Sequence, residues 1–244
     1  MQQVLEFPVS PRYSFNNFVV CGGNKAAYHF ARQLVEGNGT ENLLYLYGPP
    51  GSGKTHLLMA LGCALYRGDS TAVRCFSFRD AEQVYQGDYP SEETSKLAAF
   101  FQDAPALLVD DLHLLPDNDS VRVEFWQLFN DFYAGGRPIA IAGLLPPKEL
   151  PNLDDHLISR LMWGLVAKLD VSDDDSRRMI MQKLAADRHI KLPEDVVEYM
   201  IYHTRRDIPS LLAGFKAVCY HALSLKRKIT VRLAREALER GVTR

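Results

Sequence analysis

The sequence Gly48-Pro49-Pro50-Gly51-Ser52-Gly53-Lys54-Thr55 decides the fold class of this 244-residue chain. It fits the pattern G-x-x-x-x-G-K-[ST] at every position, and the glycines of this pattern let consecutive backbone N–H groups converge on phosphate oxygens. An apolar run precedes it and a segment with helical spacing follows it, which is the setting that a phosphate-binding loop requires. We therefore interpret these residues as a nucleotide-phosphate site rather than as a turn that matches by chance.

The last two residues of this loop carry its most specific chemistry. Lys54 is expected to reach the β- and γ-phosphates, and the hydroxyl of Thr55 is expected to ligate Mg²⁺. The helix that follows offers its positive N-terminal end to the same anion. ATP or ADP, together with Mg²⁺, is accordingly the predicted cofactor.

A short acidic motif completes the predicted site. Ala106-Leu107-Leu108-Val109 is an apolar run that predicts a buried strand, and two acids, Asp110 and Asp111, follow it directly. A phosphate-binding loop needs a carboxylate on a neighbouring strand to hold its metal. We expect Asp110 to hold Mg²⁺ and Asp111 to polarise the attacking water; the alternative is that the two acids only begin a loop.

Alternation of apolar runs and helical spacing continues up to about residue 170. Further strands are predicted at Leu43–Tyr47, Val73–Phe78 and Ile139–Ala142, and helices at Gly23–Leu34 and His56–Tyr66. This alternation is typical of an α/β fold, in which a parallel sheet carries helices on both faces.

Only helical periodicity remains after Asp170, which predicts a small all-helical lid behind the α/β core. Its helices are expected at Asp173–His189, Pro193–His203, Asp207–Leu225 and Thr230–Arg240. We therefore predict an extended arm at 1–12, an α/β nucleotide-binding core at 13–170 and a helical lid at 171–244.

The composition excludes several other classes of protein. With 28 basic and 30 acidic residues, the net charge is −2, so the chain lacks the basic excess of a dedicated DNA-binding module. The four cysteines show neither a CxxC pair nor metal-ligand spacing, which argues against disulfides and zinc and indicates a reducing cytoplasm. No segment reaches the roughly 20 apolar residues of a membrane span, and no signal peptide is recognisable. We predict a cytoplasmic protein with no membrane partner.

Several segments together resemble the DnaA-type family of AAA+ ATPases, to which the bacterial replication initiator belongs. They are Tyr13–Val20 with Gly23-Asn24, Gly53–Leu58, Asp110-Asp111, Pro146–Leu150 and Ser159–Leu165. The resemblance extends over about residues 8–240, and its last two segments are specific to this branch of the AAA+ proteins. It implies an AAA+ P-loop core followed by a lid.

The resemblance also implies roles for residues outside the two motifs. In this family the segment before the loop lines the adenine pocket, which implies nucleotide contacts for Val19 and Val20, and His56 continues the loop motif on its other side. Arg160 lies near the end of the core, where AAA+ proteins place an arginine finger for a neighbour's γ-phosphate. The alternative is that Arg160 is a surface arginine with no such role.

Two departures from the family concern DNA and self-assembly. The chain stops at Arg244, so we expect neither the initiator's helix-turn-helix domain nor direct sequence-specific DNA binding. The stretch between Phe78 and Ala106 is too short and too polar to resemble the initiator's filament-forming helical insertion. The resemblance to AAA+ proteins still allows a homo-oligomer.

Two further departures concern catalysis. The polar sensor position after the fourth strand falls within Ile141-Ala142-Gly143, which has no polar side chain, and the sensor arginine of the lid aligns with Pro209. Arg205 and Arg206 lie nearby but precede the predicted helix. Losing one group that stabilises a transition-state charge costs about 2.7–4 kcal/mol. We therefore expect weak intrinsic hydrolysis of ATP.

The N-terminal sequence Gln2-Gln3-Val4-Leu5-Glu6-Phe7 reads Q-x-x-L-x-F and resembles the peptide by which replication proteins dock on the bacterial sliding clamp. In such a peptide Gln2 would form hydrogen bonds at the rim of the site, while Leu5 and Phe7 would fill apolar pockets. The alternative is that Leu5 and Phe7 cover an edge of the protein's own core.

A clamp peptide, a DnaA-like ATPase and no DNA-binding domain together resemble the Hda family of regulators. This resemblance implies that Arg160 acts in trans on ATP bound to the DnaA initiator, while Lys54 and Thr55 hold the chain's own nucleotide. His156 stands where the initiator has a second arginine. Two alternatives fit the same residues: a non-catalytic adaptor for the clamp or the initiator, and an ATPase that resembles helicase loaders.

Overall fold

The computed structural model describes residues 13–37, 39, 41–66, 73–85, 96–151 and 153–241. By their internal contacts the residues form two compact units, and each unit is described by itself. Of the described residues, unit 1 comprises those within 13–18, His29–Tyr47 and Lys54–Ala167; unit 2 comprises those within Val19–Tyr28, Gly48–Gly53 and 168–241. The sequence predicts boundaries at residues 12 and 170 between contiguous domains. Each unit instead combines segments from different parts of the chain. The predicted boundaries therefore stay predictions.

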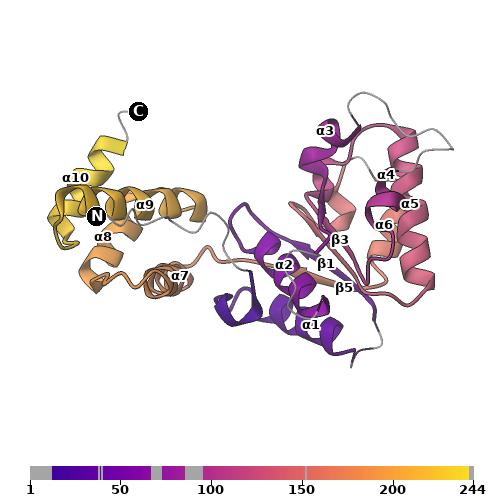
Figure 1. Ribbon diagram of the computed structural model, residues 1–244, viewed down its shortest axis with the longest axis horizontal. Helices are drawn as coiled ribbons and strands as arrows, with labels where there is room; N and C mark the ends of the chain where they lie inside the picture. The colour runs from indigo at the N-terminus through magenta and orange to yellow at the C-terminus, as the bar shows by residue number, and fades with distance from the viewer. Residues whose placement is uncertain are drawn as a thin grey trace, which may run out of the picture. The chain divides into compact units, whose positions relative to one another are not determined.

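Unit 1 is built around a five-stranded sheet with the strand order β2-β3-β4-β1-β5. Figure 1 labels β1, β3 and β5 of this sheet. The pairs β1–β4, β2–β3 and β3–β4 are parallel, and Ile139 of β4 lies opposite both Leu43 and Leu107. This sheet confirms the predicted α/β class. The strands are β1 (Leu43–Tyr47), β2 (Phe76–Ser77), β3 (Leu107–Asp110), β4 (Ile139–Gly143) and β5 (Leu165–Lys168).

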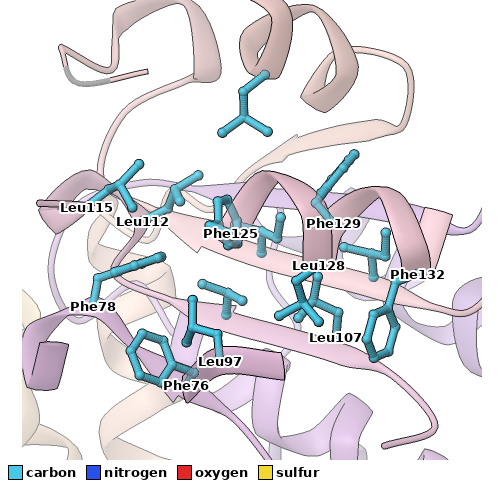
Figure 2. Packing of buried hydrophobic residues seen from close by; sticks show 14 of the residues in the cluster. Phe76, Phe78, Leu97, Leu107, Leu112, Leu115, Phe125, Leu128, Phe129 and Phe132 are labelled. Atoms are coloured by element: carbon cyan, nitrogen blue, oxygen red, sulfur yellow. The ribbon is translucent and has the colours of Figure 1, made fainter. Parts of the chain in front are cut away.

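Both faces of the central strands are buried, as their continuous apolar sequences predict. On one face, alternate residues of β1, β3 and β4 pack against Phe125, Phe129 and Phe132 of helix α5 (Asp119–Ala134), as Figure 2 shows in part. On the other face lies helix α2 (Lys54–Leu65), which approaches the sheet closely. A Cβ added at Gly62 of α2 would lie 2.6 Å from Cδ1 of Leu108 in β3.

Shorter elements connect these strands and helices. The buried carboxylate of Glu124 in α5 joins two of them, because it accepts hydrogen bonds from the hydroxyl of Tyr85 at 2.9 Å and from the backbone N–H of Leu97 at 2.7 Å. The remaining elements up to β5 are η1 (Phe15–Asn17), α1 (Lys25–Glu36), η2 (Phe78–Asp80), α3 (Ala81–Tyr85), α4 (Lys96–Phe100), η3 (Leu112–Leu114), η4 (Pro147–Glu149) and α6 (Asp155–Leu161).

The C-terminal part of unit 2 is helical, as predicted. Asp173 and Asp207 cap the first and third of its helices, and each accepts a hydrogen bond of 2.7 Å from the backbone N–H three residues later. Met181, Met200 and Phe215 meet in a core that these helices share. The helices are α7 (Asp174–Asp187), α8 (Glu194–His203), α9 (Ile208–Leu225) and α10 (Val231–Gly241).

Within the described residues, α9 is the one helix long and apolar enough, by length and composition alone, to cross a membrane. Phe215 and Val218 of α9 are nevertheless buried in the core of unit 2. This burial is the pattern of a core helix, so the length and composition of α9 are weak support for a membrane span.

The structure departs from the sequence-based expectations in three places. The predicted strand Val73–Phe78 is reduced to Phe76–Ser77: residues 73–75 lie outside it, and Phe78 already begins a 3₁₀ helix. Strand β5 was not predicted; it lies at the edge of the sheet, and its half-buried residues give a weak apolar signal. Trp126 shares its helical spacing with Phe125, which predicts a core residue, but it is only partly buried where it packs against that core.

Candidate nucleotide-binding site

The loop between β1 and α2 has the backbone that its sequence predicts. Gly51 and Gly53 have φ angles of 78° and 98°, in the region that favours glycine. Ser52 between them is 3 % exposed, and its Oγ has no hydrogen-bond partner among the described residues. A buried hydroxyl of this kind, in a loop whose backbone can turn N–H groups inward, fits a phosphate oxygen. Gly48 is buried as well, whereas Pro49 and Pro50 are exposed.

Thr55 and Asp110 meet where the predicted metal site requires it. The hydroxyl of Thr55 donates a hydrogen bond to Oδ2 of Asp110 at 2.5 Å, and Asp110 is 5 % exposed. These oxygens come from the first turn of α2 and the end of β3, and they are the ligand type that Mg²⁺ prefers. Burial lowers the pKa of Lys54, while the charges of Asp110 and Asp111 partly offset this effect. The residues present therefore fit Mg²⁺ and the phosphates that accompany it.

Asp111 is held by two neighbours at the other side of β3. It accepts hydrogen bonds on Oδ2 from the hydroxyl of Ser77 at 2.9 Å and from Nε of Arg79 at 3.2 Å. Burial raises the pKa of Asp111, but the hydrogen bonds from Arg79 and Ser77 outweigh this effect, and the net pKa lies below its usual value. Arg79 thus forms an ion pair with the carboxylate that was expected to polarise water.

His56 connects α2 to the segment before it in unit 1. Its Nε2 lies 2.9 Å from Oδ1 of Asn17 and 3.2 Å from the carbonyl oxygen of Ser14. The rings of Tyr13 and Phe18 make edge contacts with its imidazole, at centroid distances of 5.1 and 5.2 Å. The histidine therefore organises the segment that precedes Val19, and a direct contact between His56 and nucleotide stays a prediction.

Val19 and Val20 begin a loop in unit 2 that is held by hydrogen bonds of a side-chain amide. The side-chain amide of Asn24 donates to the carbonyl oxygen of Val19 at 2.9 Å and accepts from the backbone N–H of Cys21 at 2.8 Å. Both valines are half-buried. The structure brings them together in a defined loop, and their role in an adenine pocket stays a prediction.

Arg160 lies in the last turn of α6 in unit 1. Its Cζ atom lies 4.2 Å from the ring centroid of Trp126 and 5.4 Å from that of Trp163. Within the described residues, no hydrogen bond or ion pair joins Arg160 to Thr55 or Asp110. The expectation that Arg160 acts on a nucleotide held by another chain stays a prediction.

Comparison with protein families identifies this arrangement. Residues 9–168 match the bacterial DnaA ATPase domain, which is more than half of the chain. The chain belongs to the bacterial DnaA ATPase family. Residues 173–238 match a second family, the Hda lid domain, and include the helices α7 to α9 and most of α10.

Individual DnaA proteins show the same relationship. The chromosomal replication initiator DnaA of Gloeothece citriformis is 33% identical over 221 residues, which cover 88% of this chain and 48% of that protein. Domain III of Thermotoga maritima DnaA has a TM-score of 0.81 at 27% identity, over 95% of this chain and 98% of that one. AMPPCP-bound DnaA from Aquifex aeolicus shares the fold, with a TM-score of 0.72 at 24% identity, over 86% of this chain and 66% of that one. The chain thus has the AAA+ fold of DnaA and spans about half the length of the curated relative.

Gly143 ends β4, in the segment where the resemblance to DnaA places a polar sensor residue, and it has no room for a side chain. A Cβ added at Gly143 would lie 2.1 Å from the hydroxyl oxygen of Tyr45. That hydroxyl donates a hydrogen bond of 2.8 Å to the carbonyl oxygen of Leu145, and burial raises the pKa of Tyr45. Tyr45 therefore occupies the space in which a polar side chain at position 143 would begin.

Pro209 of unit 2 stands where the resemblance to DnaA places the sensor arginine of the lid. Pro209 lies in the first turn of α9, and a Cβ added at Gly51 would lie 2.7 Å from its Cδ. Pro209 therefore packs directly on the phosphate-binding loop and brings no charge to it. Arg205 and Arg206 are exposed, and Arg206 uses its carbonyl oxygen to accept a hydrogen bond from Arg177.

Several residues of the site were missed by sequence reasoning. Arg79 and Ser77 lie far from Asp111 in the chain, and no local pattern joins them. Tyr45 reads simply as an apolar position of β1, and Trp126 reads as one of several aromatic core residues. The predicted clamp peptide residues Gln2, Leu5 and Phe7 lie outside the described residues.

Proposed function

We propose that this chain is a nucleotide-binding regulator of bacterial chromosome replication initiation, tethered to the sliding clamp, which promotes hydrolysis of ATP bound to the DnaA initiator. The observation that carries the proposal is the order of the two family matches, a DnaA ATPase domain at 9–168 followed by an Hda lid domain at 173–238. The resemblance to Hda regulators implies that the hydrolysed ATP is the partner's.

The chain's own nucleotide would be held by the loop Gly48–Thr55. The backbone of this loop and Lys54 would bind the phosphates, and Thr55 with Asp110 would hold Mg²⁺, which supplies charge neutralisation when bound. Asp111 is engaged by Arg79, and position 143 carries no polar side chain. Hydrolysis of this nucleotide would be slow, so that ATP or ADP serves a structural or regulatory role.

Arg160 is the residue that we propose to act on the partner. A guanidinium group has five N–H donors in a rigid fork and is always charged, so it can stabilise the charge that develops on a γ-phosphate. Within the described residues Arg160 forms no hydrogen bond or ion pair with Thr55 or Asp110, which supports action in trans. The tether would be formed by Gln2, Leu5 and Phe7, which are proposed to dock on the sliding clamp.

The deciding experiment measures hydrolysis of ATP bound to DnaA in the presence of this chain, ADP, Mg²⁺ and clamp-loaded DNA. Arg160→Ala is expected to abolish the stimulation, because arginine fingers contribute about 10³- to 10⁵-fold to the rate. Arg32→Ala is the matched control, since Arg32 is a surface arginine paired with Glu36. Stimulation by the Arg160→Ala variant at the wild-type rate would refute the proposed role.

A non-catalytic adaptor is the second candidate, and the uncharged contact of Pro209 with Gly51 permits it. An adaptor would bind the clamp through Leu5 and Phe7 and would localise a partner without altering its hydrolysis. Calorimetry with purified clamp, comparing wild type with Leu5→Ala/Phe7→Ala, tests the tether for both candidates. Clamp binding without any stimulation of the initiator would favour the adaptor; absence of clamp binding would refute the tether.

A further inference from the structure

Arg160 is held by two aromatic rings rather than by a carboxylate. Its guanidinium lies within the roughly 6 Å of a ring centroid at which a cation is attracted to an indole face, for Trp126 at 4.2 Å and for Trp163 at 5.4 Å. The indole is the strongest of the natural partners in this interaction. Trp126 comes from α5 and Trp163 from the turn after α6, so the two rings approach Arg160 from different elements.

Both rings are anchored to the body of unit 1. Trp126 packs against the core that includes Phe125 and Phe129. Trp163 lies 5.7 Å from the ring of Tyr133, which stacks on Phe129 at 5.9 Å. The rings therefore form a fixed support for Arg160. The side chain of Arg160 loses its conformational freedom when the protein folds, so less entropy is lost when it binds an anion.

Arg160 differs from the other arginines that lie over aromatic rings in the hydrogen bonds of its guanidinium group. Arg32, Arg137 and Arg188 also lie over aromatic rings, but each of these also donates a hydrogen bond to a carboxylate or a carbonyl oxygen. The side chain of Arg160 donates none to any residue that the structure describes. The aromatic faces thus fix the cation without engaging its N–H donors.

The donors of Arg160 can also be reached from outside. Trp163 is 51% exposed and Met162 is 41% exposed, and Arg160 itself is half-buried. No acidic side chain lies within ion-pair distance of Arg160 in the described part of the chain. An anion that approaches this surface would meet a held guanidinium with no competing internal acceptor.

We propose that Trp126 and Trp163 are positioning residues that hold Arg160 with its N–H donors ready for the phosphate oxygens of a nucleotide bound to a partner chain. The planar fork of a guanidinium matches two phosphate oxygens, and holding it through its faces leaves that fork unobstructed. Only the identity of the anion rests on the proposed function. The holding of Arg160 by the two indoles is a property of this chain alone and can be tested without any partner.

The holding is tested by NMR of the Nε–Hε groups in protein with ¹⁵N-labelled arginine. Ring currents are expected to move the Arg160 resonance upfield, and Trp126→Leu is expected to return it towards the position of an exposed arginine. Trp126→Phe, which keeps a ring, should retain most of the shift. Arg137, which lies 3.6 Å from the ring centroid of Phe132, is the internal control for intact folding. An Arg160 signal that neither Trp126→Leu nor Trp163→Leu moves would overturn the proposal.

Tryptophan fluorescence gives a second readout, because Trp126 and Trp163 are the only two tryptophans of the chain. A held cation repels a cationic quencher and attracts an anionic one. Arg160→Gln is therefore expected to increase quenching by caesium and decrease quenching by iodide, whereas Arg32→Gln should change neither. Equal quenching of wild type and Arg160→Gln by both ions would contradict a cation held over the indoles.

The consequence for function is measured on hydrolysis of initiator-bound ATP. Trp126→Leu should lower the maximal stimulated rate about 2- to 30-fold, the range of a cation–π contact, at an unchanged half-saturating concentration of this chain. Trp126→Phe should restore part of the rate. Undiminished stimulation in Trp126→Leu and Trp163→Leu would overturn the positioning role. If wild type does not stimulate at all, the proposed function fails, and the NMR and quenching results still decide whether the indoles hold Arg160.

Discussion

Asp111 is restrained through its backbone as well as its side chain. Its φ and ψ angles of 53° and 39° lie in the left-handed region, which few residues other than glycine occupy. Its carboxylate accepts hydrogen bonds from Ser77 and Arg79. A carboxylate that is paired with an arginine is a weaker acceptor for the proton of an attacking water. If Asp111 polarises the attacking water, as predicted, the ion pair with Arg79 should therefore slow hydrolysis.

Removing this ion pair should raise the intrinsic rate of hydrolysis. We expect Arg79→Ala to hydrolyse bound ATP about two- to fivefold faster than wild type, a modest change because Arg79 is an exposed residue and exposed ion pairs are weak. The measurement is a single-turnover assay with excess protein over ATP and with Mg²⁺ present. High salt should reduce the difference between the two proteins, because salt screens an exposed ion pair.

Two variants test whether the faster hydrolysis expected for Arg79→Ala depends on Asp111. Asp111→Ala should be slow with or without Arg79→Ala, since the carboxylate that is released is then absent. Arg32→Ala removes a different exposed ion pair, with Glu36, and should leave the rate unchanged. A slower rate in Arg79→Ala would mean that Arg79 assists the reaction rather than restrains Asp111.

Gly143 cannot accept a side chain while Tyr45 keeps its hydroxyl. A Cβ at Gly143 would lie 2.1 Å from Oη of Tyr45 and 3.1 Å from its Cζ. Overpacking of this kind costs about 1–3 kcal/mol, so Gly143→Ala should lower the free energy of unfolding by that amount. The change is measured by urea denaturation, and the same clash should prevent a simple Gly143→Asn substitution from restoring a polar sensor.

A double-mutant cycle tests this explanation. Tyr45→Phe removes the closest atom but leaves the carbonyl oxygen of Leu145 without its hydrogen bond, at a cost of about 1 kcal/mol. In the double variant the clash is largely relieved, so the two destabilisations should fall short of additivity by about 1 kcal/mol. Strict additivity would show that the space at Gly143 is not limited by Tyr45.

At the scale of elements, the sequence was most informative where one element provides its own signal. Strand β1 has the predicted bounds Leu43–Tyr47, because five consecutive apolar residues precede a turn of glycine and proline. The predicted strand at Val73–Phe78 failed at its end, since the hydroxyl of Ser77 caps the backbone N–H of Arg79 and a 3₁₀ helix begins there. Such local hydrogen bonding competes with strand pairing and leaves no trace in hydrophobic periodicity.

Glu124 shows how a buried polar residue can join elements that are separate in sequence. It is 5% exposed, and its carboxylate accepts from Tyr85 of α3 and from the N–H of Leu97 in α4. Glu124→Ala leaves both donors unsatisfied and should destabilise the protein by about 2–4 kcal/mol. Glu124→Gln keeps one acceptor oxygen and should cost about 1 kcal/mol.

Chemical denaturation of the two variants checks this order of stabilities. Tyr85→Phe removes one of the two donors together with its demand for a partner, so it should be milder than Glu124→Ala. If Glu124→Ala were as stable as wild type, the carboxylate would not join α3 and α4 to α5 in solution.

At the scale of the whole molecule, the two halves of the candidate site differed in how far they could be predicted. The loop Gly48–Thr55 and the Asp110-Asp111 pair are contiguous in sequence, and their residue types follow from phosphate and metal chemistry. The contacts of Arg160 with Trp126, and of Arg79 with Asp111, join residues that only the fold brings together. No local pattern contains that information, because periodicity reports the face on which a residue lies and not its partner across the fold.

Nucleotide should stabilise the folded protein if the loop binds it. A ligand at one hundred times its dissociation constant stabilises the state that binds it by about 2.7 kcal/mol. For a protein of this size each kcal/mol raises the melting temperature by about 2–4 °C, so we expect ADP with Mg²⁺ to raise it by about 5–10 °C. Differential scanning fluorimetry over a series of ADP and ATP concentrations measures this shift and its saturation.

The same series with variants separates the phosphate contact from the metal contact. Lys54→Ala should lose most of the shift with either nucleotide, because the loop then lacks its one cation. Thr55→Ala should retain a shift that no longer depends on Mg²⁺, since its hydroxyl is the expected ligand beside Asp110. Arg32→Ala should melt and respond as wild type does. A wild-type melting temperature that millimolar ADP or ATP leaves unchanged would contradict nucleotide binding, and with it the regulatory role proposed for the chain's own nucleotide.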